Sequence, residues 1–472
     1  MKHESIPINR KALKINLDTE FYGSIAEIGG GQETARNFFI AGASSGTVAK
    51  SISAYDKSFS DKLYNKNKPG RYVSEGRLVK MLDQEYRELT EVLVLKKEST
   101  NFFAFADTVE VLNFAKDNYS HGWMGIKFQL RPDGEPNTVI IHVKLLENDT
   151  QLQQKTLGEL GVNLIYACNY YYEHPDIFLQ SLLDNLSVDR LRITMIRMSG
   201  PDLDYVDNRL LGVQLVKFGM THAIMFDKNG DVQQPSDMLY KKNVLAFRGS
   251  FNPITYVAKD ILNASLELFQ KDEDYKPDNT LSFCEITLNN LFREGEIDER
   301  DFLERANMLN DIGQNVMISD IREYYSLVEF FSQFKIQKLR IVMGVPSLEH
   351  VFNEKYYINL KGGILEAIGK MFPKNIKIYI YPTIDRESKT LRKSKDIQPQ
   401  GSIQHLYNYL LENRYILDIS SKMADQLHVK SHEVHKMIEQ GNPEWEKYVP
   451  MIVANKIREK RLFGYSGSKS KG

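Results

Sequence analysis

The hydrophobic pattern divides the chain into a helical beginning followed by two series of strands and helices. Up to about residue 95 the pattern is mainly helical and interrupted by glycines, and the clearest helix is expected over residues 75–95. From about residue 100 short apolar runs predict strands. The expected strands of this part are 102–106, 123–130, 138–145, 162–167, 191–196 and 222–226.

Two of these strands are joined by a short connection that predicts a hairpin. Residues 131–137 include Pro132-Asp133-Gly134 between strands 123–130 and 138–145, which favours an antiparallel pair. The later runs are continuously apolar and alternate with helix-length segments. That alternation indicates a parallel sheet covered on both faces.

A second alternating series begins at residue 243. Its expected strands are 244–247, 283–288, 316–319, 339–343 and 376–381, and helices are expected over 298–309, 321–331 and 363–372. The fold class is α/β, with a doubly wound, Rossmann-like domain preceded by a second α/β region and a helical N-terminal segment. One (β/α)-barrel stays open as the alternative, because the strand spacing also suits a barrel. The expected divisions are 1–98, 99–238, 239–420 and 421–472.

The composition of the chain argues against some classes of function. Lys and Arg number 61 against 62 Asp and Glu, so no overall positive field draws in nucleic acid. No apolar run approaches the ~18 residues of a membrane span, and the N-terminus has no apolar signal region. The two cysteines, Cys168 and Cys284, lie in apolar, strand-like runs and are expected to be buried thiols. We therefore expect a cytoplasmic protein without a nucleic-acid or membrane partner, and homo-oligomerisation stays open.

The segment from Arg248 to Thr255 carries the clearest candidate chemistry. It reads Arg-Gly-Ser-Phe-Asn-Pro-Ile-Thr, and it joins strand 244–247 to a helix over 257–269. A glycine between a strand and a helix N-terminus lets the backbone approach a phosphate, and the first helical N–H groups point at the anion. The Asn252-Pro253 step fixes the turn. Gly249, Ser250, Phe251 and Asn252 are therefore predicted to bind a nucleotide.

This segment resembles the first motif of the nicotinate/nicotinamide mononucleotide adenylyltransferases, G-S-F-D-P-x-H-x-G-H. Further along, Gly344 and Leu348 keep part of the family's G-A-D-x-L segment, which resembles residues 344–348 here. The stretch 387–392 faintly resembles the family's I-S-S-T-x-I-R motif. The resemblance covers about 240–420 and implies a nucleotidyltransferase fold that binds ATP with Mg²⁺ and moves an adenylyl group to a pyridine mononucleotide. It places Gly344 and Ser347 among the nucleotide-binding residues.

The chain departs from this family where the chemistry takes place. The two histidine positions of H-x-G-H are Thr255 and Ala258 here, and the alanine side chain donates no hydrogen bond. Thr255 is the expected weak donor and Arg392 the expected phosphate clamp, with Lys259 and Arg248 as other cations to recruit. The competing class is a non-catalytic binding or assembly protein that has kept the fold.

The whole chain also resembles a group of bacterial proteins labelled as nicotinate-nucleotide adenylyltransferases without a demonstrated activity. The phrases that carry this likeness are Gly29–Glu33, Ser53–Asp56, Arg71–Val73 and Ser199–Asp202. It implies a shared architecture.

Three other patterns have a simpler structural interpretation. Gly29–Gly31 before a helix could hold a phosphate, but a plain turn is favoured. His428, His432 and His435 share a helix face that is expected to be solvated, and no metal site is predicted. Polar residues after several expected strands are interpreted as cap or turn residues. A different α/β enzyme that uses them stays open as an alternative. These polar residues are Asn169, His174, Arg197, Ser199, Asp202, Asp204, Asp227, Asp231, Asn289 and Asn290.

Overall fold

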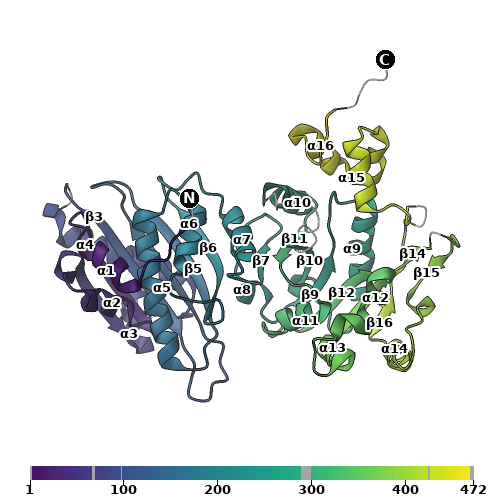
Figure 1. Cartoon of the computed structure of the whole chain (residues 1–472), viewed down its shortest axis with the longest axis horizontal. Coiled ribbons are helices and arrows are strands. Elements are labelled where there is room, and N and C mark those ends of the chain that lie inside the picture. Colours follow the sequence, from purple (N-terminus) through teal and green to yellow (C-terminus); the bar gives the residue numbers. More distant parts are fainter. Residues whose placement is uncertain are drawn as a thin grey trace. The chain divides into compact units, whose positions relative to one another are not determined.

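The chain folds into two compact units, Met1–Thr221 and His222–Gly472 (Figure 1). The computed structural model describes residues 3–65, 70–96, 98–288, 299–385, 387–423 and 426–467. Each unit has its own sheet and its own buried apolar core, so each is described separately. Within these residues, no helix combines the length and apolar character needed to cross a membrane.

The first unit is built on a mixed six-stranded sheet. In the order β2-β1-β3-β4-β5-β6, the first three strands are parallel to one another and the last four are antiparallel. The predicted hairpin is confirmed as β4 and β5. The parallel arrangement expected for the later strands is wrong for the run 191–196, because this run forms β6, which pairs antiparallel with β5. The strands are β1 (Phe21–Gly29), β2 (Val48–Ala54), β3 (Asn101–Glu110), β4 (His121–Phe128), β5 (Asn137–Leu145) and β6 (Leu191–Ser199).

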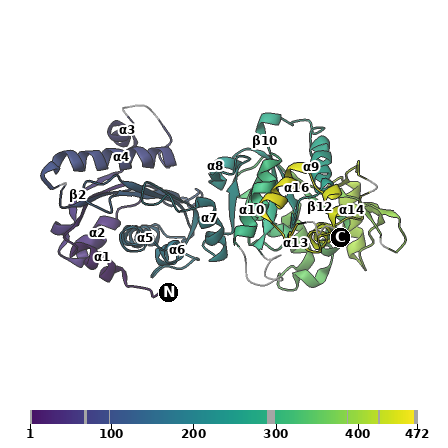
Figure 2. The same cartoon turned by 90° about the horizontal axis from the view of Figure 1, so that it is seen from above.

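Helices cover both faces of this sheet, and two sequence expectations need correction. Figure 2 shows α3 (Lys57–Tyr64) and α4 (Glu75–Val92) on one face, and the other face carries α1 (Ile8–Asn16), α2 (Thr34–Ala41), α5 (Thr150–Tyr170) and α6 (Pro175–Leu182). Helix α7 (Asn208–Lys217) follows β6.

The segment 1–98, expected to be helical, also contributes β1 and β2 to the sheet. The run 162–167, expected to be a strand, lies inside α5; this part of α5 is buried on every side, so it shows no helical periodicity.

The second unit has an eight-stranded sheet with a Rossmann-like core. Its order is β16-β13-β12-β9-β10-β11-β7-β8, and the strands from β16 to β11 run parallel. Counted along the chain from β9, these six strands have the doubly wound order 3-2-1-4-5-6. Both sheets are open, so the barrel alternative is wrong. The strands are β7 (Ala223–Phe226), β8 (Val232–Gln233), β9 (Asn243–Arg248), β10 (Thr280–Thr287), β11 (Asn315–Ser319), β12 (Lys338–Gly344), β13 (Ile376–Tyr381) and β16 (Ile416–Asp418).

The connections of the second unit are mostly helical. A small hairpin, β14 (Thr383–Ile384) with β15 (Leu391–Arg392), lies apart from the main sheet. The helices are α8 (Pro235–Leu239), α9 (Tyr256–Phe269), α10 (Glu299–Asp311), α11 (Tyr324–Ser332), α12 (Val345–Val351), α13 (Gly363–Met371), α14 (Ile403–Glu412), α15 (Ser431–Glu439) and α16 (Met451–Lys460). Short 3₁₀ helices occur in the chain at Ser44–Gly46, Val94–Lys96, Pro277–Asn279, Glu354–Tyr357, Ser394–Asp396 and Pro443–Tyr448.

Candidate functional site

The two turns singled out in the sequence leave from neighbouring strands. β9 and β12 are adjacent and parallel, with Phe247 opposite Val342, so Gly249 and Gly344 leave the sheet at the same edge. From β9 the chain continues to β10 on one side, and from β12 it continues to β13 on the other. In doubly wound sheets this reversal opens a crevice outside the carboxyl ends of the strands, where ligands bind. The predicted segments therefore flank the ligand-binding position of the fold.

The Gly249 turn is held by the sheet beneath it. The Gly249 N–H donates to the main-chain carbonyl of Glu285 on β10 at 3.0 Å. Phe251 is buried and packs edge-on against Phe247, with ring centres 5.3 Å apart. A Cβ atom at Gly249 would come within 2.9 Å of the Phe251 ring, so the close packing of this ring accounts for the glycine. Ser250 is exposed at the surface of the turn.

Thr255 begins helix α9 rather than facing an open site. It is only 4% exposed, and its Oγ1 accepts the Ala258 N–H at 3.2 Å. This is the N-cap position, where a hydroxyl oxygen satisfies one of the free amides of the first turn. The sequence hypothesis that Thr255 is a weak donor therefore falls on a residue whose oxygen already has a structural role.

Arg248 lies below the turn and is tied to three elements. Its guanidinium makes two hydrogen bonds with the Glu285 carboxylate and donates to the Arg322 carbonyl at 2.6 Å. The same group lies 4.7 Å above the ring of Tyr324. Burial raises the pKa of the Tyr324 hydroxyl, and the Ser347 side chain next to it acts in the opposite direction. Tyr324 thus connects the β9 and β12 sides of the crevice, a link that no local sequence pattern reveals.

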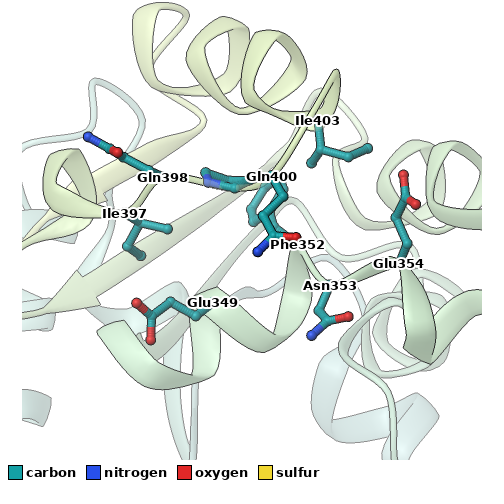
Figure 3. A pocket seen from close by; sticks show the side chains of 9 residues that line it. Glu349, Phe352, Asn353, Glu354, Ile397, Gln398, Gln400 and Ile403 are labelled. Atoms are coloured by element: carbon teal, nitrogen blue, oxygen red, sulfur yellow. The ribbon is translucent and has the colours of Figure 1, made fainter.

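Arg392 pairs with an acidic residue of α12. Its Nη2 lies 2.6 Å from Glu349 Oε1, and both side chains are partly exposed. Glu349 also lines a cavity of about 400 Å³ beside α12, which Figure 3 shows from close by. Carboxamides and carboxylates contribute most of its polar groups; the lining residues are Glu349, Phe352, Asn353, Glu354, Ile397, Gln398, Pro399, Gln400 and Ile403. As a phosphate clamp, Arg392 would have to exchange Glu349 for the ligand.

The C-terminal helix α15 makes a contact with the turn that the sequence did not predict. Asn252 donates its N–H to Ser431 Oγ at 3.0 Å, and its Oδ1 lies 2.8 Å from His435 Nδ1. Of the three histidines expected on a solvated face, His428 and His432 are exposed, whereas His435 is 24% exposed. Within the described ranges no group of three His, Cys, Asp or Glu residues is placed to hold a metal ion. His428 lies in a turn before α15, so only His432 and His435 belong to the helix on which all three were expected. The sequence did not predict that His435 contacts the Gly249 turn.

The glycines of the first unit do not form a phosphate cradle. Helix α2 follows Gly31, and the Glu27 carboxylate accepts its first amides, those of Thr34 at 2.8 Å and Ala35 at 3.2 Å. Burial raises the pKa of Glu27 to about 6 and that of its neighbour Asp107 well above the ordinary value. The N-terminus of α2 is thus already neutralised from within the protein, which favours the turn interpretation.

A cavity of about 400 Å³ does lie at the carboxyl ends of β1, β2 and β3 in the first unit. Its wall includes Lys57, whose Nζ lies 4.8 Å above the ring of Tyr72. Of the three consecutive glycines, Gly29 and Gly30 line this cavity. It is a second concave surface, separate from the Gly249 turn.

The polar residues expected at strand ends are spread over both units, and several of them have partners within the protein. Asn169 lies in α5, and His174 precedes α6, so neither follows a strand. Asp202 accepts hydrogen bonds from Arg131 and Asn137 at 2.9 Å each. The remaining members are Arg197, which pairs with Glu75, Ser199 at the end of β6, the turn residues Asp204, Asp227 and Asp231, and Asn289 and Asn290, which lie outside the described residues.

Comparison with known proteins gives distant structural likenesses. No protein-family model and no curated protein sequence matches the chain. A solved structure described as a "putative nicotinate-nucleotide adenylyltransferase" from Vibrio parahaemolyticus is similar at 14% identity and a TM-score of 0.25, covering 48% of this chain and 97% of that one. The competence/damage inducible protein CihA from Agrobacterium tumefaciens is similar at 16% identity and a TM-score of 0.25, covering 35% of this chain and 98% of that one.

Proposed function

We propose that the second unit binds a nucleotide at the crevice between β9 and β12. The observation that carries this proposal is the doubly wound strand order, which puts the Gly249 and Gly344 turns on the two sides of the chain reversal. The phosphates would lie at the N-terminus of α9, a helix of 14 residues that starts directly after the turn.

The residues of the turn have different roles in the proposed binding site. Gly249 and Ser250 approach the phosphates through the main chain, and Phe251 and Asn252 fix the shape of the turn. Thr255 caps α9, so it orders the first turn of the helix whose N–H groups face the anion. Gly344 and Ser347 bound the nucleotide on the other side.

We propose adenylyl transfer from ATP to a pyridine mononucleotide as the specific reaction to test at this site. Mg²⁺ would arrive with ATP, because it binds substrate phosphates and keeps several waters. Thr255 and Ala258 stand at the positions where the adenylyltransferases have two histidines, and Arg392 is held by Glu349. Transfer would therefore be slow even where binding is retained.

Calorimetric titration with ATP tests binding. Ser250→Glu places a negative charge on the exposed surface of the turn and should weaken ATP binding at least about tenfold through charge repulsion. The matched control is Ser332→Glu, which adds the same charge to an exposed serine at the end of α11 and should leave the affinity unchanged. Wild-type protein that binds neither ATP nor NAD contradicts the proposal.

Pyrophosphate release separates binding from transfer. The protein is supplied with ATP, Mg²⁺ and nicotinate or nicotinamide mononucleotide, and pyrophosphate is measured over time. Release that Ser250→Glu abolishes supports a transferase. Tight ATP binding without release supports a non-catalytic binding protein, and a homo-oligomer that binds no nucleotide supports an assembly role.

A further inference from the structure

We infer that Ser431 and His435 of α15 are positioning residues of the turn formed by residues 249–255, called the nucleotide turn below. The affinity for phosphate then depends on helix α15. This inference rests on the proposed nucleotide binding and assigns it a determinant nearly 180 residues away in the sequence. In Figure 1 α15 lies next to α9, and the hydrogen bonds to Asn252 show where the two segments meet.

The contact involves both the main chain and the side chain of Asn252. Ser431 Oγ accepts the Asn252 N–H at 3.0 Å and donates to the Pro253 carbonyl at 2.8 Å. The His435 Nδ1–H donates to Asn252 Oδ1 at 2.8 Å, while Nε2 lies 3.1 Å from Glu439. Three bonds therefore hold Asn252 and Pro253, which lie three and two residues before Thr255, the N-cap of α9.

The orientation of these two residues determines where the following amides point. Thr255 caps α9 only two residues after Pro253, and the first helical N–H groups come directly afterwards. A phosphate needs these N–H groups to converge before it binds, because ordering them during binding lowers the affinity. Helix α15 supplies this order in advance.

The helix is firmly anchored, which a positioning element requires. Val434 and Ile438 of α15 are completely buried, and the His435 ring packs at 5.6 Å from that of Phe463. Helix α16, further along, is tied to α10 by ion pairs of Lys456 with Asp311 and of Lys460 with Glu304. From the same α10, Arg305 Nη1 lies 3.5 Å from the Ser250 carbonyl. The C-terminal helices and α10 thus hold the turn from two sides.

Titration of three ligands with full-length variants tests this inference. The ligands are ATP, inorganic tripolyphosphate and adenosine, and each variant is checked by its melting temperature. His435→Ala should weaken ATP and tripolyphosphate about tenfold, as the loss of about 1.4 kcal/mol of ordering does, and leave adenosine unchanged. His435→Asn keeps a donor near the position of Nδ1 and should recover most of the affinity. His432→Ala, on the exposed face of the same helix, should bind like wild type.

The outcomes separate this inference from the proposed function. Wild-type affinity in both His435→Ala and Ser431→Ala would overturn the positioning role and leave nucleotide binding standing. An equal loss for adenosine and tripolyphosphate would also overturn it, since that pattern indicates a general structural defect. Wild-type protein that binds neither ATP nor tripolyphosphate removes the proposed function, and the inference with it.

Discussion

Arg248 and Glu285 form a buried ion pair across the neighbouring strands β9 and β10, directly beneath the Gly249 turn. Nε lies 2.9 Å from Oε2 and Nη2 lies 2.8 Å from Oε1, and Ser319 donates to the same carboxylate at 2.7 Å. Glu285 has no exposed surface. A pair of this kind adds little net stability, but loss of one partner leaves an uncompensated charge in the core.

Arg248→Met should therefore destabilise the second unit by about 3–5 kcal/mol. The measurement is urea unfolding followed through Trp445, in a Trp123→Phe background that removes the chain's other tryptophan. Lys447→Met breaks the exposed pair with Glu444 and should leave the free energy of unfolding close to that of wild type, because solvent screens such a pair. Arg248→Met combined with Glu285→Leu should regain part of the loss. Equal stabilities of the Arg248 and Lys447 variants would contradict the argument.

The second sheet was largely predictable because its strands are continuous apolar runs between turn signals. Expected strands 244–247, 283–288, 316–319, 339–343 and 376–381 correspond to β9 to β13, and their alternation with helices indicated a doubly wound sheet. The same rule did not apply to α5, a helix buried on every side whose run 162–167 has the composition of a strand. The local hydrophobic pattern identifies a buried segment more reliably than it distinguishes a helix from a strand.

The candidate site was predictable only where it is contiguous in the sequence. Gly249 to Thr255 form one turn, so their placement follows from local signals. The approach of Tyr324 to Ser347 and the hydrogen bond of Asn252 to Ser431 depend on strand order and on helix packing, which no local pattern determines. Arg392 was expected near a phosphate because of its charge, and its partner Glu349 emerged only from the fold.

Thr255→Ala should destabilise the second unit by about 1 kcal/mol, because it removes the N-cap of α9. Thr255→Ser keeps the capping oxygen and should lie within a few tenths of a kcal/mol of wild type. Urea unfolding through Trp445 measures both variants. If the Ser variant were as unstable as the Ala variant, methyl packing rather than capping would be the role of this residue.

Neither cysteine should react in the folded protein. Cys168 and Cys284 are completely buried, and burial raises the pKa of both thiols, so little thiolate is present or accessible. Titration with a chromogenic disulfide at pH 8 should give no rapid reaction in the native state. In denaturing urea the same reagent should report two thiols per chain. A fast native reaction at one thiol would show that its surroundings open readily.

Glu27 should give the first unit a stability that falls as the pH rises. Burial raises the pKa of Glu27 from 4.5 to about 6, outweighing the hydrogen bonds from Thr34 and Ala35 that favour the ionised form. Below about pH 4.5 the carboxyl is protonated in both the folded and the unfolded chain. Between about pH 4.5 and 6 only the unfolded chain loses the proton readily, so ionisation favours unfolding. The expected loss is about 2 kcal/mol, and it is complete above the folded pKa.

Unfolding of a Trp445→Phe protein through Trp123, at intervals from pH 4 to 7, measures this dependence in the first unit. The glutamine of Glu27→Gln cannot ionise. Between pH 4.5 and 6 the free energy of unfolding of this variant should therefore fall by about 2 kcal/mol less than that of wild type. The raised pKa of Asp107 should leave a further decline in both proteins. The control is Glu91→Gln, at an exposed position of α4, which should keep the full slope. Identical slopes in the Glu27 and Glu91 variants would mean that Glu27 is ionised in the folded protein throughout this range, its charge stabilised by the N-terminus of α2.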